Sequence, residues 1–308
     1  MFRLLPDTPN FKFMRWRLIY FVISGMLMLA SLGYCAVLGL NYGIDFEGGV
    51  LVEVRTQGPA DLGAMRAKLG NLGLGEVTLQ EFGEPTDVLI RVQKQPGGEA
   101  AQQKAVEVLR EALGKEVEYR RVEFVGPQVG DELIMAGITA VVLSMIAIMI
   151  YIWFRFEWQF GVCGVLALVH DVVATIGVFS ILQFEFNLST VAAILTIAGY
   201  SINDTVVIYD RIRENLRKYK RMDLEELFDR SLNETLSRTI RTSFTTLLAV
   251  LALYFFGGEA IAGFSFAIIF GILVGTYSTI CVATPLVLYM NLPRDSDAGR
   301  SSRVEKTA

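Results

Sequence analysis

The sequence has 308 residues, of which 53% are apolar and 19% are charged, and its net charge is -4. A soluble domain carries about 25% charged residues, so this composition excludes a disordered chain and argues against a single soluble core. The small net charge gives no sign of nucleic-acid binding. A single histidine, His170, and three scattered cysteines exclude a zinc enzyme built on several such ligands, and we expect no metal site.

Six stretches reach the length of about 20 mostly apolar residues that crosses a membrane. They predict spans over 18–40, 133–154, 160–182, 188–209, 237–256 and 261–290, with a kink near Pro285 in the last. The first apolar run exceeds the core of a cleaved signal peptide, so we expect a retained helix. The expected regions are 1–40 (N-terminus and first span), 41–132 (an external domain), 133–290 (spans two to six) and 291–308 (a polar tail).

The orientation follows from lysine and arginine residues near the span ends, which favour the cytoplasmic side. Basic residues gather in the N-terminal tail, in the loop after the fourth span and in the C-terminal tail. An even number of spans places all three regions on one side. We therefore expect a multi-pass inner-membrane protein with both termini in the cytoplasm.

The insert 41–132 carries ten basic and sixteen acidic residues and lies outside in this topology. Its alternating and helical patterns predict the element order βαββαβ, which is that of a small ferredoxin-like α+β domain. The predicted elements, in chain order, are strand 49–55, helix 60–72, strands 77–82 and 88–92, helix 99–113 and strand 116–125.

Few polar side chains fall inside the predicted spans, where a charge costs several kcal/mol, by estimates of about 2.5 upward. His170 and Asp171 stand in the middle of the third span, and Asn203 and Asp204 in the fourth. Such residues are candidates for a proton relay. The alternative is that Asp171 is a structural carboxylate and His170 a packing residue, since neighbours on a helix point about 100° apart and need not meet.

Asp204 is the stronger candidate because hydroxyl and amide side chains flank it along the helix. Arg238, at the start of the fifth span, lies at a similar depth. It either extends to the interface or turns inward to pair with Asp204, in which case protonation would break the pair. Arg241, one turn further along, is the competing partner.

Four motifs resemble those of the SecD/SecF family of protein-translocase subunits, which belongs to the RND superfamily. They are the GIDFEGG run at 43–49, the VGPQVG run at 125–130, the His170-Asp171 pair and the seventeen residues 199–215. The first two contain Gly43, Asp45, Gly48, Gly49, Gly126 and Pro127 and border the insert at both membrane junctions. These residues either act as hinges for the external domain or only form turns. The single insert of about 90 residues favours the SecF branch over SecD, whose external region is larger.

The resemblance implies a six-helix half of an RND-like module that pairs with SecD. In this family the module uses the proton-motive force to drive late preprotein translocation at the SecYEG channel, with YajC and YidC as further candidate partners. It further implies that Asp204 and Arg238 act in proton transport. No enzyme activity and no cofactor are expected.

Three other functions remain as alternatives. Half of an RND-type small-molecule efflux transporter would use similar buried carboxylates, although such pumps have two larger external loops. An intramembrane aspartyl protease would need a GxGD motif that is absent around Asp204. A structural scaffold would use Asp171 and Asp204 only for packing.

Overall fold

A computed structural model describes residues 9–75, 77–114, 117–125, 127–258 and 261–290. Within these ranges six helical segments are long and apolar enough to cross a membrane, which confirms the expected number. They are α1 (Arg17–Leu38), α5 (Pro127–Arg155), α6 (Trp158–Leu182), α7 (Leu188–Lys218), α8 (Leu224–Phe256) and a last span made of α9 (Ala262–Ser278), the π-helical turn η4 (Thr279–Ala283) and α10 (Thr284–Tyr289). A short 3-10 turn, η1 (Met14–Trp16), precedes α1.

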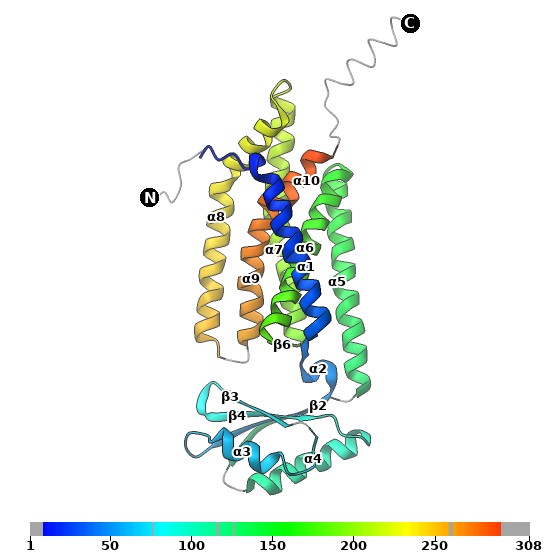
Figure 1. Cartoon of the computed structure of the whole chain (residues 1–308), viewed down its shortest axis with the longest axis vertical. Coiled ribbons are helices and arrows are strands. Elements are labelled where there is room, and N and C mark those ends of the chain that lie inside the picture. The colour runs from blue at the N-terminus through cyan, green and yellow to red at the C-terminus, as the bar shows by residue number, and fades with distance from the viewer. Residues whose placement is uncertain (1–8, 76, 115–116, 126, 259–260, 291–308) are drawn as a thin grey trace, which may run out of the picture.

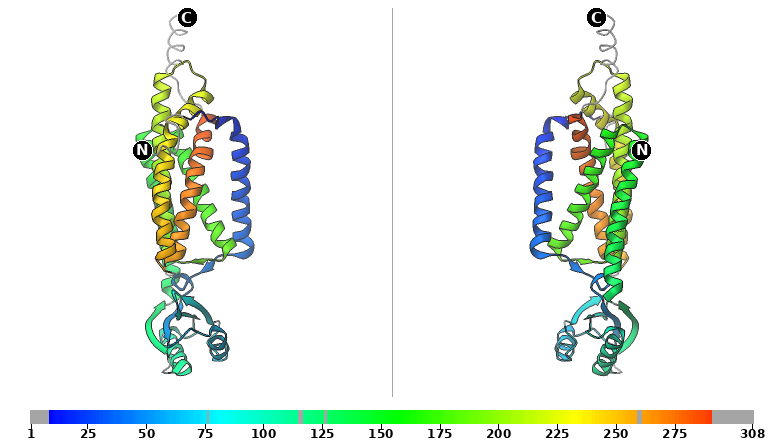
Figure 2. Two further views of the ribbon diagram at one scale, coloured as in Figure 1. Left: turned by 90° about the vertical axis from the view of Figure 1, so that its left-hand side faces the viewer. Right: turned by 90° about the vertical axis from the view of Figure 1, so that its right-hand side faces the viewer.

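The six spans stand side by side as a bundle, with a small sheet domain at one end (Figure 1). The N-terminal segment and α10 lie at the other end. Helices α6, α7 and the last span are about half buried, whereas α1, α5 and α8 are largely exposed. The exposed apolar side chains of these helices suit contact with lipid. Their backbones need no water there, because a helix satisfies its backbone hydrogen bonds internally. Figure 2 shows α1 at one side of the bundle, where it packs against α6.

Three helices extend beyond the apolar segments that predicted them. Helix α5 begins at Pro127 rather than near residue 133, α7 continues to Lys218, and α8 begins at Leu224 rather than near residue 237. Hydropathy detects only the part of a helix that lies in hydrocarbon. The charged turns of α7 and α8 therefore continue the two helices as a hairpin outside the apolar layer.

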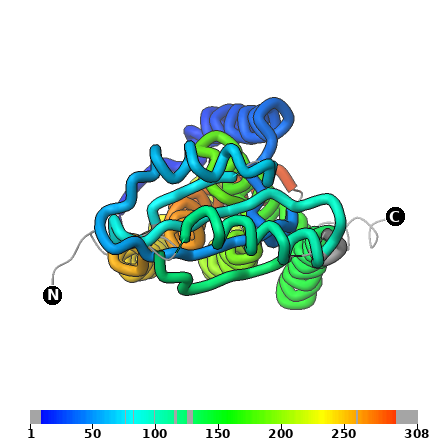
Figure 3. The backbone as a smooth tube through the Cα atoms, turned by 90° about the horizontal axis from the view of Figure 1, so that it is seen from below, coloured from blue at the N-terminus to red at the C-terminus, as the bar shows by residue number. Residues whose placement is uncertain are grey.

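The sheet domain has the expected βαββαβ order. Its elements are β2 (Gly49–Thr56), α3 (Leu62–Leu69), β3 (Val77–Phe82), β4 (Glu84–Gln93), α4 (Gly98–Leu113) and β5 (Val117–Val125). The four strands form an antiparallel sheet in the order β3-β4-β2-β5, which is the ferredoxin-like arrangement. Both helices cover the face of the sheet that points away from the bundle (Figures 1 and 3).

The alternation of β2 explains this placement. Val50, Val52 and Val54 are fully buried in the domain core, whereas the residues between them are only partly buried. Successive side chains of a strand point to opposite faces, so the second face of the sheet is left toward the membrane bundle.

A π-helical turn precedes Pro285 in the last span, where the sequence predicts a kink. Proline has no backbone N–H and clashes with the preceding turn, and the helix widens here. The Thr284 hydroxyl donates to the backbone oxygen of Thr279 (2.8 Å), bridging this turn. Such π turns occur frequently at functional sites.

Candidate functional site

The carboxylate of Asp171 lies fully buried where three spans meet. Its Oδ2 accepts hydrogen bonds from the hydroxyls of Ser201 on α7 (2.8 Å) and Ser278 on α9 (2.9 Å). Gly275 makes this approach possible, because a Cβ there would lie 3.1 Å from the Ser201 side chain and 3.5 Å from the carboxylate. The packing of α6 against α7 and α9 therefore centres on this one acidic side chain.

His170 contacts Asp171 directly, since its Nδ1 lies 3.1 Å from Asp171 Oδ1. The imidazole is 4% exposed, and its Nε2 is buried without a hydrogen-bond partner among the described residues. The ring lies 6.3 Å, centroid to centroid, from the ring of Tyr277, whose hydroxyl is 3.0 Å from Ser24 Oγ on α1. The sequence left open whether these adjacent residues meet, and in the structure they form one polar group facing α1.

Asp204 is also buried, with 3% of its surface exposed. The hydroxyl of Thr242 on α8 donates to its Oδ1 at 3.4 Å. One residue further on α7, the Thr205 hydroxyl is 2.9 Å from that of Thr279 in the π turn. The carboxylate therefore sits between α7 and α8 beside the widened part of the last span.

The structure does not make the ion pair between Asp204 and Arg238. Arg238 is exposed. Its positive charge acts on the Asp204 carboxylate, but no hydrogen bond or short ion pair joins the two in the described part of the chain. The competing Arg241 donates instead to the backbone oxygen of Ser237 (2.8 Å) on its own helix. Equal depth in the bilayer does not fix the direction of a side chain, and the Thr242 hydroxyl donates to the carboxylate directly.

Asn203 is likewise separated from the buried group. It is exposed although its neighbour Asp204 is buried, as expected for consecutive residues on a helix. Asn203 and Arg238 therefore lie on the outer surface of this chain.

Hydroxyl groups lie near both buried carboxylates along one side of α7. Ser201, Asp204 and Thr205 are spaced i, i+3 and i+4 and share a face. Ser201 binds Asp171, while Thr205 reaches Thr279. A hydroxyl can donate or accept, so it can serve an ionised or a protonated carboxyl group. The arrangement suits uptake and release of protons within the bundle.

Sequence reasoning missed the partners Ser278, Thr279 and Thr242. Their signal is weak, because single hydroxyl residues are common in membrane spans. The adjacent pair Ser278-Thr279 just before Pro285 was the available clue. Within the described residues, no group of three metal-binding side chains occurs.

The GIDFEGG run forms a compact anchor at the sheet-domain end of the bundle. The short strand β1 (Asn41–Tyr42) directly precedes the run. It pairs in parallel with β6 (Glu185–Phe186) in the loop between α6 and α7. The helical turn α2 (Ile44–Glu47) follows, and Gly43 N–H donates to the backbone oxygen of Phe186 (2.8 Å). Asp45 then accepts from the backbone N–H of Leu188 (2.9 Å), the first residue of α7. A carboxylate is favourable at this position, where helix N–H groups lack partners.

Two of the candidate hinge glycines have conformations that other residues rarely adopt. Gly48 has φ +73° and Gly49 has φ +133°. A Cβ on Gly49 would lie 2.6 Å from the backbone oxygen of Val92. At the other junction, Gly126 lies outside the described residues and Pro127 begins α5, a position where proline is favoured.

A salt bridge crosses from the sheet domain to the bundle. Arg91 of β4 pairs with Glu185 of β6. The absence of a side chain at Gly43 provides the space, since a Cβ there would lie 2.6 Å from the Glu185 carboxylate. The domain thus contacts the loop that leads into α7.

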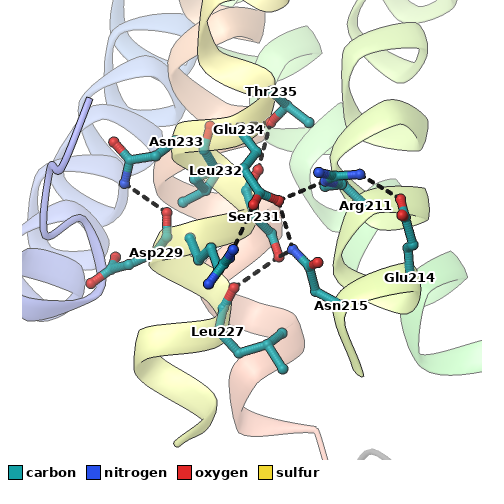
Figure 4. Close-up of polar contacts among 11 residues, drawn as sticks. Arg211, Glu214, Asn215, Leu227, Asp229, Ser231, Leu232, Asn233, Glu234 and Thr235 are labelled. Atoms are coloured by element: carbon teal, nitrogen blue, oxygen red, sulfur yellow. Dashed lines mark hydrogen bonds and ion pairs between the residues drawn. The ribbon is translucent and has the colours of Figure 1, made fainter. Parts of the chain in front are cut away.

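The opposite end of α7 is fastened to α8 by a polar cluster (Figure 4). Glu234 accepts from Arg211 (2.6 Å) and from Asn215 (2.9 Å), and Asn215 also donates to Ser231 Oγ (3.0 Å). These hydrogen bonds therefore stabilise the hairpin of the two helices outside the apolar layer.

Comparison with known families and structures adds to this geometry. The model of the "Protein export membrane protein SecD/SecF, C-terminal" family matches residues 105–292, and the "SecD/SecF GG Motif" model matches residues 34–60. The second match contains the anchor described above.

Individual relatives agree with these family matches over most of the chain. The chain is 50% identical over 294 residues to the "Protein translocase subunit SecF" of Rickettsia rickettsii, covering 94% of this chain and 95% of the relative. A protein of the same name from Rickettsia bellii is 51% identical over 289 residues, covering 92% and 95%.

Solved structures extend the comparison to a longer protein. The fold matches the crystal structure of SecDF, a translocon-associated membrane protein from Thermus thermophilus, with a TM-score of 0.81 and 37% identity. The match covers 92% of this chain and 39% of that one, so this chain spans about two fifths of SecDF. SecDF in its super-membrane-facing form gives a TM-score of 0.69 and 34% identity, covering 100% and 41%.

Proposed function

Because the chain belongs to the SecF family of protein translocase subunits, we propose that it pairs with SecD and uses the proton-motive force to drive late preprotein translocation across the inner membrane. It is a transport component and a multi-pass membrane protein. In this proposal the partners are SecD, the SecYEG channel, preproteins and, further, YajC and YidC. The chain acts without enzymatic turnover and without a bound cofactor.

The observation that carries the proposal is the buried position of Asp204 inside a span. A carboxylate held against a neighbouring helix by a hydroxyl can exchange a proton as the helices move. Asp171 and His170 form a second polar group, which Ser201 contacts about one turn of α7 away from Asp204. Arg238 and Asn203 lie exposed on the same chain, and in this proposal SecD covers them and brings Arg238 into the relay.

The basic end of the bundle supports an orientation with both termini in the cytoplasm. The sheet domain then lies in the periplasm, where preproteins emerge. Motion of this domain takes place about Gly48-Gly49 and Gly126-Pro127, while Gly43 and Asp45 stay fixed to the bundle.

The test is Asp204→Asn, which keeps the size of the side chain and removes its proton exchange. We expect the variant to assemble with SecD but to lose proton-driven secretion, measured as accumulation of late translocation intermediates. Asp223→Asn is the matched control, because Asp223 is an exposed helix cap and asparagine caps equally well. Full secretion by Asp204→Asn would support a scaffold instead.

Co-purification separates protein export from small-molecule efflux. We expect SecD and SecY to be recovered with the chain from detergent-solubilised membranes. Recovery of an outer-membrane duct in their place would contradict the proposal.

A further inference from the structure

An open groove with a surplus of positive charge lies where α7 leaves the bundle. Its volume is about 540 Å³. One stripe of α7 faces the last residue of α5 across it. The lining residues are Arg155, Asp210, Arg213, Glu214, Arg217 and Lys218.

The acidic residues of the groove do not neutralise it. Asp210 pairs with Arg155 (2.8 Å), and Glu214 pairs with Arg211 (2.6 Å), which lies outside the groove. Four basic residues and two acidic ones line the groove. Glu157 beside the groove pairs with one of the four, Arg213 (3.7 Å), so a smaller surplus of positive charge remains. Arg217 is exposed and has no hydrogen bond or ion pair within the residues that the structure describes.

Large aromatic side chains place the groove at the depth of lipid headgroups. Trp153 and Phe154 precede Arg155 and are 63% and 94% exposed, and Trp158 follows it with 56% exposed. Aromatic side chains of this kind gather at the boundary between hydrocarbon and water. An anion that enters the groove therefore lies in the headgroup layer rather than in the cytosol.

The outer surface of α5 continues from the groove into the apolar layer. Leu143, Ile146 and Ile150 are exposed along it. A molecule with an anionic head and long acyl chains thus meets a basic groove and an apolar surface in the correct order.

We propose that this groove binds the phosphate headgroup of an anionic phospholipid such as phosphatidylglycerol. Arginine guanidinium groups bind phosphate oxygens in pairs, and basic pockets between membrane helices bind anionic headgroups. The site is separate from the buried carboxylates and does not depend on the proposed transport function.

Native mass spectrometry of the purified full-length chain tests the site, with phosphatidylglycerol added and phosphatidylethanolamine as the second lipid. We compare wild type with Arg217→Ala and with Arg221→Ala. Arg221 is exposed at the tip of the hairpin, outside the lining residues, so its replacement removes the same charge elsewhere. A basic residue near an anionic membrane contributes about a fivefold change in affinity.

The expected result is about fivefold weaker phosphatidylglycerol binding for Arg217→Ala, with little change for Arg221→Ala or for phosphatidylethanolamine. Inorganic phosphate in excess should displace the lipid if the phosphate group is what the groove recognises. Equal lipid binding by all three proteins would overturn the proposal. So would stabilisation by inorganic phosphate without any retained lipid, which would indicate a site for soluble anions.

Discussion

Removing the hydroxyl donors of Asp171 one at a time should show how strongly this carboxylate joins the three inner spans. Ser201→Ala and Ser278→Ala each delete one hydrogen bond to the same oxygen, Oδ2. The double variant leaves that oxygen without a donor among the residues described. The two single changes and the double change form a complete double-mutant cycle.

The magnitude follows from the charge and the setting. A hydrogen bond to a charged group contributes about 1.5–3 kcal/mol in soluble proteins. Interhelical side-chain bonds in a membrane protein average about 0.6 kcal/mol and reach about 1.7 kcal/mol. We therefore expect each single variant to lose about 1–2 kcal/mol of unfolding free energy. The double variant should lose about 1 kcal/mol more than the sum, because a buried acceptor is then left unsatisfied.

The assay is reversible unfolding in mixed detergent micelles, monitored by circular dichroism. Ser265→Ala is the matched control, since Ser265 lies on the same helix, is fully buried and has an Oγ without a partner. Its replacement should change the unfolding free energy by less than about 0.5 kcal/mol or increase it. Additive losses in the cycle, or a Ser265→Ala effect as large as that of Ser278→Ala, would refute the assigned role of the Asp171 network.

Three further predictions concern the sheet domain and its anchor. Gly49→Ala should destabilise the domain by about 1–3 kcal/mol in thermal unfolding, because it forces an alanine into φ +133° against a backbone oxygen of β4, whereas Gly58→Ala, in open space, should not. The Asp87 carboxylate has a pKa lowered from 3.8 by its hydrogen bond to Arg55; it therefore stabilises the fold above pH 3.8, and this stabilisation is lost as the pH falls through the lower folded value. Hydrogen exchange of the β4 amides should become faster as this stabilisation is lost. In Asp87→Asn the pH dependence of the exchange that comes from this carboxylate should be absent. Asp45→Ala should speed exchange of the first amide of α7 by about fivefold, since a helix N-terminal carboxylate contributes up to about 1 kcal/mol; unchanged exchange would contradict the anchor.

The architecture was largely predictable because it depends on length and periodicity. A span needs about 20 apolar residues, and each predicted span lies within or close to an observed helix. The alternation around Val52 predicted a strand in the same way, and that strand is β2, which lies inside the sheet. The charged end of α7 and the charged start of α8 lie outside the predicted spans because they are helical in water, where hydropathy carries no signal.

The site was predictable only in part. The cost of charge in hydrocarbon identified Asp171 and Asp204, and both are buried. Their partners depend on the direction of each side chain and on helices far apart in the sequence, as with Ser278 and Asp171. For the same reason the sequence left open whether Arg238 extends to the interface or turns toward Asp204; in the structure it is exposed, with its charge acting on Asp204 from beyond hydrogen-bond distance.

The hydrogen bond between Asp45 and the start of α7 links this membrane helix to the segment that leads into the sheet domain. Asp204 lies sixteen residues from Leu188 on one continuous helix, about 24 Å away at 1.5 Å per residue. A straight helix transmits a push or a twist along its axis with little loss. We therefore expect a displacement of the segment before Gly48 to shift the backbone at Asp204, and a shift at Asp204 to move that segment in return.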